Sequence, residues 1–333
     1  MSAVLGIDLG GSAIKWTVSR AAAEFGPVET RPTPSSPEDI VEAIRGIVDA
    51  ARAPGAEAGP GNGEGTAEAP RALCLGTPGL VDDRGHIRGA AANLPGWGNR
   101  PVAEILSEAL DLPVTVQNDT TLALFAEYRV GSARDARNVV GVFIGTGIGG
   151  GLCLDGEVYL GHRNLAGEVG HVTVVPNGAP CGCGRRGCLE RYAAAVGLLR
   201  VCRELAPAYS ASERRPESPL AARVKADPET LTTGEILEAE GKGDPLASAV
   251  IGQAGEMMAR ALGSVINTLA PELIVFGGGV MEGGPALMEA TRLRLPPYVL
   301  ADALSGVSFT TATLGPGAGA IGAALYAREA WER

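Results

Sequence analysis

The chain has 333 residues, of which 45% are hydrophobic and only 4% aromatic, a length that suits two domains with cores of small aliphatic side chains. Its formal net charge of −10 argues against a general nucleic-acid-binding protein, which would present a basic face. No apolar run is long enough to span a bilayer and the first residues lack the layout of a signal peptide, so we expect a cytoplasmic protein without transmembrane helices.

The N-terminal region is predicted to form a β-hairpin followed by a helix. An apolar run over 4–8 ends in a carboxylate and two glycines, and a second apolar run over 14–18 follows, which is typical of a hairpin. Ser36 is a good N-cap and is followed by Pro37, a residue favoured at the first helical position. The apolar positions that mark one face of this helix are Ile40, Ile44, Ile47 and Ala51.

The middle of the chain alternates between strands and helices. Residues 54–70 are of low complexity and predict a surface loop. Strands are predicted over 71–76 and over 113–117, and the second leads into a helix over 120–129. A buried strand over 138–144 then ends in a glycine-rich turn.

The C-terminal half continues the same pattern. Residues 207–219 are polar and proline-rich and predict a loop. A long helix is predicted from Asp244 towards Ala270, then a strand over 273–276 and a last helix over 318–329. This alternation indicates an α/β protein with mostly parallel sheets. A strand that ends in a polar or glycine turn recurs near residues 8, 145 and 277.

The first of these turns combines an acid with glycines. Asp8 ends a strand, and Gly10, Gly11 and Ser12 form the turn before Lys15. Such a turn can offer backbone N–H groups to a phosphate and a carboxylate to Mg²⁺. A tight turn with a solvated carboxylate is an equally good interpretation of these residues alone.

The second turn matches the dinucleotide-binding pattern G-x-G-x-x-G at Gly145, Gly147 and Gly150. That fingerprint should begin a helix, whereas residues 151–158 have the pattern of a strand and a turn. The sequence therefore favours a phosphate-binding hairpin over a nicotinamide-binding turn. No G-x4-G-K-[ST] motif is present, which excludes a P-loop.

The third turn, Gly277 to Gly279, would allow close approach of a flat or phosphorylated group, although a flexible connection explains it as well. Asn118 and Asp119 lie between a predicted strand and a helix. Asp119 could be only an N-cap, or it could be a general base at the carboxyl end of a strand, where α/β proteins bind ligands.

A histidine and three cysteines have the spacing H-x9-C-x-C-x4-C, which predicts a closed tetrahedral zinc site. Glu168 and Glu190 flank this segment, so a zinc ion there would also fix two carboxylates. The other three cysteines stand alone in apolar surroundings, as expected in a reducing compartment. The predicted zinc ligands are His171, Cys181, Cys183 and Cys188, and the isolated thiols are Cys74, Cys153 and Cys202.

Taken together, these motifs resemble the ROK family (repressors, open reading frames, kinases) of the actin-like ATPase superfamily, and within it the bacterial glucokinases. The resemblance covers nearly the whole chain and is most specific in the cysteine-rich segment. The segments that carry it are 5–15, 75–97, 116–131, 143–161, 165–193 and 271–280.

The resemblance implies an α/β fold of two ribonuclease-H-like domains that flank a cleft. The small domain would comprise 1–117 with about 315–333, and the large domain 118–314 would carry the segment 171–188 with the predicted zinc ligands, here called the zinc loop. The implied activity is phosphorylation of a hexose by ATP with Mg²⁺, with glucose as the favoured substrate and a homodimer or homotetramer as the assembly. Mannose, fructose or an N-acetylated sugar, polyphosphate as the donor, and a non-catalytic sugar sensor remain alternatives.

The resemblance also implies a role for each group of residues, with Asp119 as the catalytic base and zinc as a structural ion. The phosphate- and nucleoside-binding residues would be Asp8, Gly10, Gly11, Ser12, Lys15, Gly145, Thr146, Gly147, Gly277, Gly278 and Gly279. The sugar-binding residues would be Asn93, Asn118, Asp119, Glu168, His171 and Glu190. The zinc ligands would be His171, Cys181, Cys183 and Cys188.

Overall fold

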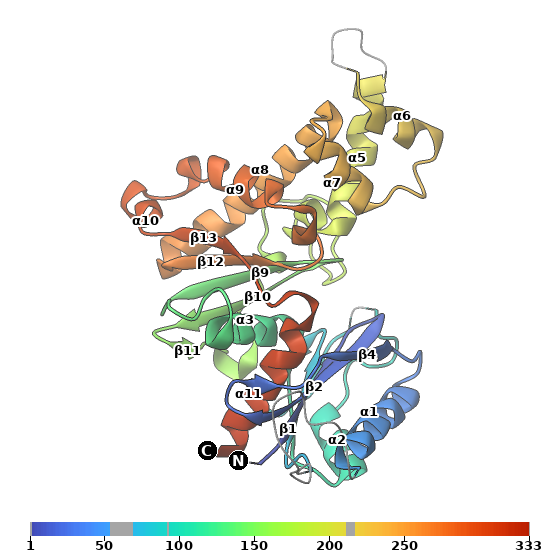
Figure 1. The fold of residues 1–333 in the computed structure, drawn as a ribbon. Coiled ribbons are helices and arrows are strands. Elements are labelled where there is room, and N and C mark those ends of the chain that lie inside the picture. The colour runs from blue at the N-terminus through green and yellow to red at the C-terminus, as the bar shows by residue number, and fades with distance from the viewer. Residues whose placement is uncertain (1, 54–68, 92, 211–216, 333) are drawn as a thin grey trace.

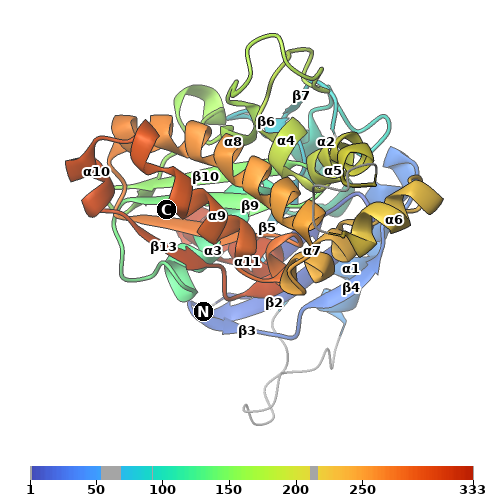
Figure 2. The same ribbon diagram turned by 90° about the horizontal axis from the view of Figure 1, so that it is seen from above.

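The computed structural model describes residues 2–53, 69–91, 93–210 and 217–332, and every structural statement below refers to these. The loop predicted over 54–70 falls outside them except for its last two residues. Two sheets, each with helices on both faces, make up the fold (Figures 1 and 2). None of the helices in the described part of the chain combines the length and apolar character needed to cross a bilayer.

The first sheet is built around the predicted N-terminal hairpin. β1 pairs antiparallel with β2 and parallel with β5, which pairs parallel with β8, in the order β3-β2-β1-β5-β8 with β4 also on β2. Its strands are β1 (Val4–Leu9), β2 (Ala13–Ala21), β3 (Glu24–Phe25), β4 (Glu29–Pro32), β5 (Leu73–Thr77) and β8 (Val114–Asn118). A separate hairpin consists of β6 (Leu80–Val81) and β7 (Ile87–Arg88).

The two faces of β1 are covered by different helices, because side chains alternate along a strand. Leu5, Ile7 and Leu9 pack with α1 (Pro37–Arg52) and α2 (Val102–Leu110). On the other face, a Cβ added to Gly6 would lie 2.2 Å from the carbonyl oxygen of Ala320, so α11 (Ala318–Glu332) packs directly on the backbone of β1. Asp8 is next along this same face.

Helix α1 confirms the predicted N-cap, since the Ser36 hydroxyl accepts a hydrogen bond from the backbone N–H of Asp39. Ile40, Ile44 and Ile47 of its predicted face are buried. Ala51 is only half-buried, because the helix reaches the sheet through Val48 instead.

The second sheet has the order β11-β10-β9-β12-β13, with β9, β12 and β13 parallel and β10 antiparallel to β9. Val140, Val142 and Ile144 of β9 face the core that contains α8. Val139 and Phe143 face α3. The elements are β9 (Val139–Ile144), β10 (Ile148–Leu154), β11 (Glu157–Val158), β12 (Leu273–Gly277), β13 (Ser308–Thr311), α3 (Asp119–Val130), α5 (Ala195–Ser210), α8 (Pro245–Leu269) and α9 (Ala286–Arg294).

Helices α3 and α11 lie between the two sheets and pack against each other (Figure 1). A Cβ on Gly322 of α11 would lie 1.9 Å from the carbonyl oxygen of Leu122 of α3, so only glycine permits this crossing. The remaining elements are α4 (Glu190–Ala193), α6 (Pro219–Ala226), α7 (Thr233–Gly241), α10 (Ala301–Ser305) and 3-10 turns at His162–Asn164, Val169–His171, Met281–Gly283, Pro296–Tyr298 and Gly315–Gly317.

The loop predicted over 207–219 is wrong at both ends. Helix α5 continues through Pro207 to Ser210, because Val201, Cys202 and Ala206 anchor it in the core. At the other end, Pro219 begins α6 after Ser218, whose hydroxyl accepts a hydrogen bond from Ala221 N–H. Proline favours the first position of a helix as readily as a loop.

Candidate active site

A cavity of about 700 Å³ lies at the carboxyl ends of β1, β8 and β12, so it draws its walls from both sheets. The first sheet contributes Asp8 and Lys15, and the N-terminus of α3 contributes Asp119. The turn after β12 contributes Gly277, Gly278 and Gly279. Asp8 and Gly279, about 270 positions apart in the chain, thus line one cavity. In the sequence, only the family resemblance connected them.

The two carboxyl groups of the cavity influence each other. Burial and, to a lesser extent, the charge of Asp119 raise the pKa of Asp8, Lys15 lowers it, and the result is a pKa of about 7. Burial also raises the pKa of Asp119, against hydrogen bonds such as the one from Thr120 N–H at 2.8 Å. Two half-buried acids beside one ammonium group suit the handling of a proton and of a cation.

Asp8 also lies against the beginning of α11. A Cβ added to Gly319 would be 2.7 Å from the Asp8 carboxyl carbon, so a larger residue would displace the carboxylate. Lys15 reaches the same segment, because its Nζ donates to the carbonyl oxygen of Pro316 at 2.9 Å. The hairpin and the α11 N-terminus therefore form one wall of the cavity.

Asn118, rather than Asp119, caps α3. The Asn118 Oδ1 atom accepts hydrogen bonds from the N–H groups of Thr120 (3.0 Å) and Thr121 (3.1 Å), and its amide nitrogen donates to Gly79 O at 3.2 Å. Asp119 is the first helical residue and faces the cavity. The interpretation of Asp119 as a mere N-cap is therefore wrong.

The turn after β12 needs glycine at its centre. Gly278 has a φ of +87°, and a Cβ there would lie 2.5 Å from the carbonyl oxygen of Ile144. Val280 N–H donates to the same oxygen at 3.0 Å, so the turn is held against the end of β9. The alternative interpretation of residues 277–279 as a flexible connection is therefore wrong.

The glycines after β9 form a hairpin turn, as predicted, and not the start of a dinucleotide-binding helix. β10 follows Gly147 directly and pairs antiparallel with β9. The turn closes through a hydrogen bond from Gly145 N–H to Gly147 O at 2.9 Å, and Thr146 at its tip is exposed. This turn does not line the cavity; a Cβ on Gly147 would instead meet Glu190 Oε2 at 2.9 Å.

The first turn, by contrast, approaches one of the predicted sugar ligands. Gly11 and Ser12 are exposed at the bend between β1 and β2, next to Gly10. A Cβ on Gly11 would lie 2.5 Å from the Cβ of Asn93, which has a left-handed backbone with φ 61°. Asn93 is thereby held beside the predicted phosphate turn but does not line the cavity.

Three further predicted sugar ligands lie together. The Nε2 atom of His171 is 4.0 Å from Glu168 Oε2, and its Nδ1 atom is 4.0 Å from Glu190 Oε1. Burial raises the pKa of Glu168, His171 lowers it, and the negative charges of Asp119 and Glu190 raise it. Glu168 therefore lies within electrostatic reach of both Asp119 and Glu190.

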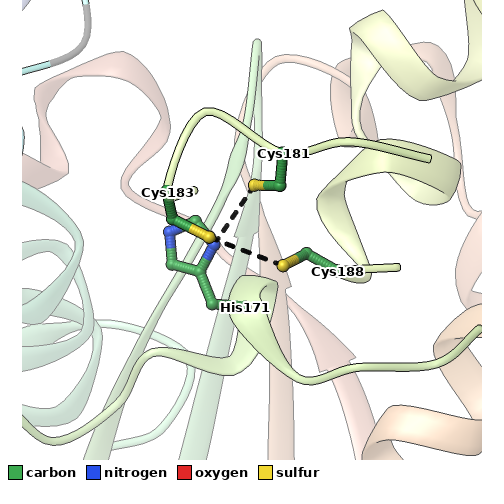
Figure 3. A group of neighbouring side chains, drawn as sticks. All are labelled: His171, Cys181, Cys183 and Cys188. Atoms are coloured by element: carbon green, nitrogen blue, oxygen red, sulfur yellow. Dashed lines mark hydrogen bonds between the residues drawn. The ribbon is translucent and has the colours of Figure 1, made fainter. Parts of the chain in front are cut away.

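The predicted zinc ligands converge (Figure 3). One ligand atom from each of the four residues lies within 4.8 Å of the others. The His171 Nδ1 atom is 3.7 Å from Cys181 Sγ, and the sulfur atoms of Cys183 and Cys188 are 3.6 Å apart. Tetrahedral zinc with Zn–S bonds of about 2.3 Å requires sulfur atoms about 3.8 Å apart. The four residues thus fit zinc in both chemistry and spacing.

The thiols of this cluster differ in acidity. Burial raises the pKa of Cys183, but hydrogen bonds from Arg185 and the two neighbouring thiols lower it to about 6. Burial raises the pKa of Cys181, whose thiol also donates to Glu190 Oε1 at 2.9 Å. Glu190 therefore touches both the zinc loop and, through Gly147, the turn after β9.

Sequence reasoning missed most of the residues that line the cavity. These residues share no motif. The glycine-rich segment 315–319, at the start of the helix predicted over 318–329, is the one sequence signal that could have indicated a ligand-binding segment. The missed lining residues are Thr120, Ala123, Phe143, Phe276, Met281, Glu282, Gly284, Pro285, Met288, Thr311, Ala312, Gly315, Pro316, Ala318 and Gly319.

Comparison with known proteins places the chain in a family. The model of the ROK family matches residues 4–330. The chain belongs to the ROK family. It is 37% identical over 250 residues to a glucokinase of Halalkalibacterium halodurans, covering 74% of this chain and 73% of the relative.

Two further relatives match over nearly the full length. A glucokinase of Streptomyces coelicolor is 30% identical over 330 residues, covering 99% of this chain and 98% of the relative. An N-acetylmannosamine kinase of Escherichia fergusonii is 29% identical over 329 residues, covering 97% and 98% of the two chains.

A solved ROK structure supports the fold. A glucokinase from Streptomyces griseus, in complex with glucose and AMPPNP, superposes with a TM-score of 0.79 at 28% identity, covering 98% of this chain and 100% of that chain. The α/β fold of the actin-like superfamily expected from the resemblance is confirmed.

Proposed function

We propose that this ROK chain transfers the γ-phosphoryl group of ATP to a hexose, with glucose as the first candidate substrate and Asp119 as the general base. The observation that carries the proposal is the half-buried Asp119 carboxyl, which shares one cavity with Asp8, Lys15 and the Gly278 turn. The two glucokinase relatives and the neighbour with glucose and AMPPNP support this choice of activity.

In this proposal a primary hydroxyl of the hexose attacks the γ-phosphorus while its proton passes to Asp119. The bond between the γ-phosphorus and the bridging oxygen breaks, and its electron pair leaves on ADP. A positioned carboxylate of this kind contributes about 10²- to 10⁴-fold to a rate. Exclusion of water by closure of two domains, 1–117 with about 315–333 against 118–314, would suppress hydrolysis of ATP.

The cavity has an apolar end that could hold the adenine base of ATP and a charged end that could hold its phosphates. Met281 and Met288 line it beside Gly278, where a flat base could lie. Asp8 and Lys15 line the charged end, towards Asp119. The turns Gly10–Gly11–Ser12 and Gly145–Thr146–Gly147 do not line the cavity in this structure; on closure of the two domains, backbone N–H groups at the tips of these turns would face the phosphates. Asp8 would hold Mg²⁺, which neutralises charge on the transferred group when bound.

The sugar would lie beyond Asp119, against Asn93, Asn118 and the zinc loop. The carboxylates of Glu168 and Glu190 would accept from sugar hydroxyls, and a pocket built to pair hydroxyls rejects analogues that lack them. Zinc on His171 Nδ1 and the three cysteines would fix the imidazole orientation and leave Nε2 for the sugar side. The ion would hold the loop and take no part in phosphoryl transfer.

The test is release of ADP by the purified protein with ATP, Mg²⁺ and glucose, beside mannose, fructose and N-acetylmannosamine. We expect release that depends on glucose and exceeds that with the other sugars. Preference for N-acetylmannosamine, the substrate class named for one relative, would keep the mechanism and change the sugar. No release with any sugar, with either ATP or polyphosphate as the donor, would refute the proposed kinase activity and favour a sugar sensor.

We further propose a cytoplasmic location and a homodimer or homotetramer. All six cysteines are free thiols in the structure, and Cys74, Cys153 and Cys202 are buried, which suits a reducing compartment. Sedimentation of the purified protein would measure the assembly.

A further inference from the structure

One buried carboxylate outside the cavity collects more hydrogen bonds than any local role in a helix requires. Glu127 lies on α3, eight residues after Asp119, and its side chain is fully buried. Its Oε2 atom accepts from the N–H (2.8 Å) and hydroxyl (2.9 Å) of Ser132, just past the end of the helix. The proposed chemistry makes no use of this residue.

The other partners of Glu127 come from the far end of the chain. Its Oε1 atom accepts from the backbone N–H groups of Thr313 (2.7 Å) and Leu314 (2.8 Å), and its Oε2 atom also accepts from the Thr313 hydroxyl at 3.1 Å. These two residues connect β13 to α11. A buried carboxylate that accepts several N–H and O–H bonds is a rigid attachment, because each donor would be left unpaired without it.

The two segments that Glu127 joins both lead into walls of the proposed ATP cavity. From α3 come Asp119, Thr120 and Ala123. The segment 315–319, which follows Leu314 directly, supplies the residues beside Asp8 and the carbonyl group that accepts from Lys15. A shift of Thr313 and Leu314 relative to α3 would therefore move one wall of the cavity relative to the proposed base.

Other contacts keep α3 and α11 together in the absence of this attachment. Arg129 pairs with Glu329 at 2.8 Å, and Phe125 meets Tyr326 edge-on with ring centroids 5.9 Å apart. These contacts lie towards the C-terminal end of α11, far along the helix from the cavity. Loss of the Glu127 bonds should thus loosen the cavity wall without separating the helices.

We propose that Glu127 is a positioning residue for the nucleotide: its carboxylate fixes the 313–314 segment against α3 and thereby sets the distance between the 315–319 wall and Asp119. The inference rests on the proposed function, because the nucleotide is the ligand that spans these two walls. Glu127 touches neither substrate, so its effect is on nucleotide affinity and alignment. The sugar side, which involves neither segment 313–314 nor 315–319, keeps its affinity.

A matched pair of substitutions separates this role from simple stabilisation. Ser132→Ala and Thr313→Val each remove one hydroxyl that donates to the same Oε2 atom, at 2.9 Å and 3.1 Å, but only Thr313 lies on the far segment. We expect Thr313→Val to weaken binding of Mg·AMPPNP about three- to fivefold by calorimetry, and Ser132→Ala to leave it within about twofold. Glucose affinity without nucleotide should stay within about twofold in both.

Glu127→Gln is the stronger test, because either orientation of the amide turns its NH₂ group towards a backbone N–H. We expect its KM for ATP and its Kd for Mg·AMPPNP to rise by about tenfold, with glucose affinity unchanged. A lower Tm with unchanged nucleotide affinity would show a purely structural role and overturn the inference, as would equal effects of Ser132→Ala and Thr313→Val. If Glu127→Gln does not fold, the matched pair decides alone.

The wild-type protein distinguishes this inference from the proposed function. Wild-type protein that binds Mg·AMPPNP but phosphorylates no hexose would refute the kinase activity, and the affinity ratios would still decide the role of Glu127. Wild-type protein that binds no nucleotide would overturn both.

Discussion

At the scale of single residues, Asp119 has the strongest expected effect. Because Asn118 provides the cap of α3, replacing Asp119 by Asn should leave the helix intact while it removes the proton acceptor. We expect turnover to fall by about 10²- to 10⁴-fold with glucose affinity kept. Steady-state kinetics measure the turnover, and calorimetry on the same preparation measures the glucose affinity. Near-normal turnover would exclude Asp119 as the base.

The same substitution should stabilise the ligand-free protein. Burial raises the pKa of Asp119, so the folded chain holds a proton that the unfolded chain releases. The contribution of Asp119 to the free energy of unfolding is therefore fully present below about pH 4, the pKa of an unfolded Asp. It is lost as the pH rises through the raised pKa of the folded protein.

Asp119→Asn removes this loss, so its Tm should exceed that of the wild type at about pH 8, with the difference shrinking towards about pH 4. Thermal unfolding followed by circular dichroism at the two pH values is the measurement. A constant difference between them would contradict the burial argument.

At the scale of elements, the β12 turn offers a matched pair of glycines. Gly278→Ala puts a Cβ 2.5 Å from Ile144 O at a φ of +87°, whereas a Cβ on Gly279 meets nothing within 4 Å. We expect Gly278→Ala to destabilise the protein by about 1–3 kcal/mol and Gly279→Ala by much less. Denaturant unfolding compares the two, and equal losses would mean that the turn is not held against β9.

The zinc loop is the second element for which we predict the effect of a substitution. Cys183→Ser removes one proposed ligand at an exposed position, so the fold should survive while the loop loosens. We expect bound zinc to be lost and glucose to bind about 10- to 100-fold more weakly, because the ligated His171 orients the sugar side. Metal analysis and calorimetry measure these effects, with Cys153→Ala, a buried thiol outside the loop, as the control. Unchanged glucose affinity in zinc-free protein would refute the coupling.

Local signals explain why many elements could be predicted. The Ser36–Pro37 start, the hairpin of β1 and β2 and the spacing of the zinc ligands are each set by residues that lie close together in the chain, the zinc ligands between His171 and Cys188. Where one signal has two meanings, prediction fails: proline favours both loops and first helical turns, which misplaced the region around Pro219. Similarly, Asn118 and Asp119 are both good N-caps, and only the packing of α3 decides between them.

At the scale of the whole molecule, the cavity itself could not be predicted from residue patterns. The contact of Lys15 with Pro316 joins residues 301 positions apart, and the packing of Gly319 on Asp8 is of the same range. Such contacts follow from the crossing of α3 and α11, which depends on a single glycine at Gly322. The family resemblance located the motifs, but the wall at 315–319 and the bonds of Glu127 emerge only in three dimensions.

The packing of α11 on β1 has a consequence for synthesis. The first strand of the chain buries Gly6 under Ala320, and Val4 and Cys74 pack with Ala323, so the N-terminal sheet is complete only when the last helix has left the ribosome. At translation rates of about 5–20 residues per second, this apolar face of the sheet stays uncovered for more than about ten seconds during synthesis. Until α11 covers it, this face of the sheet is apolar surface through which incomplete chains can aggregate.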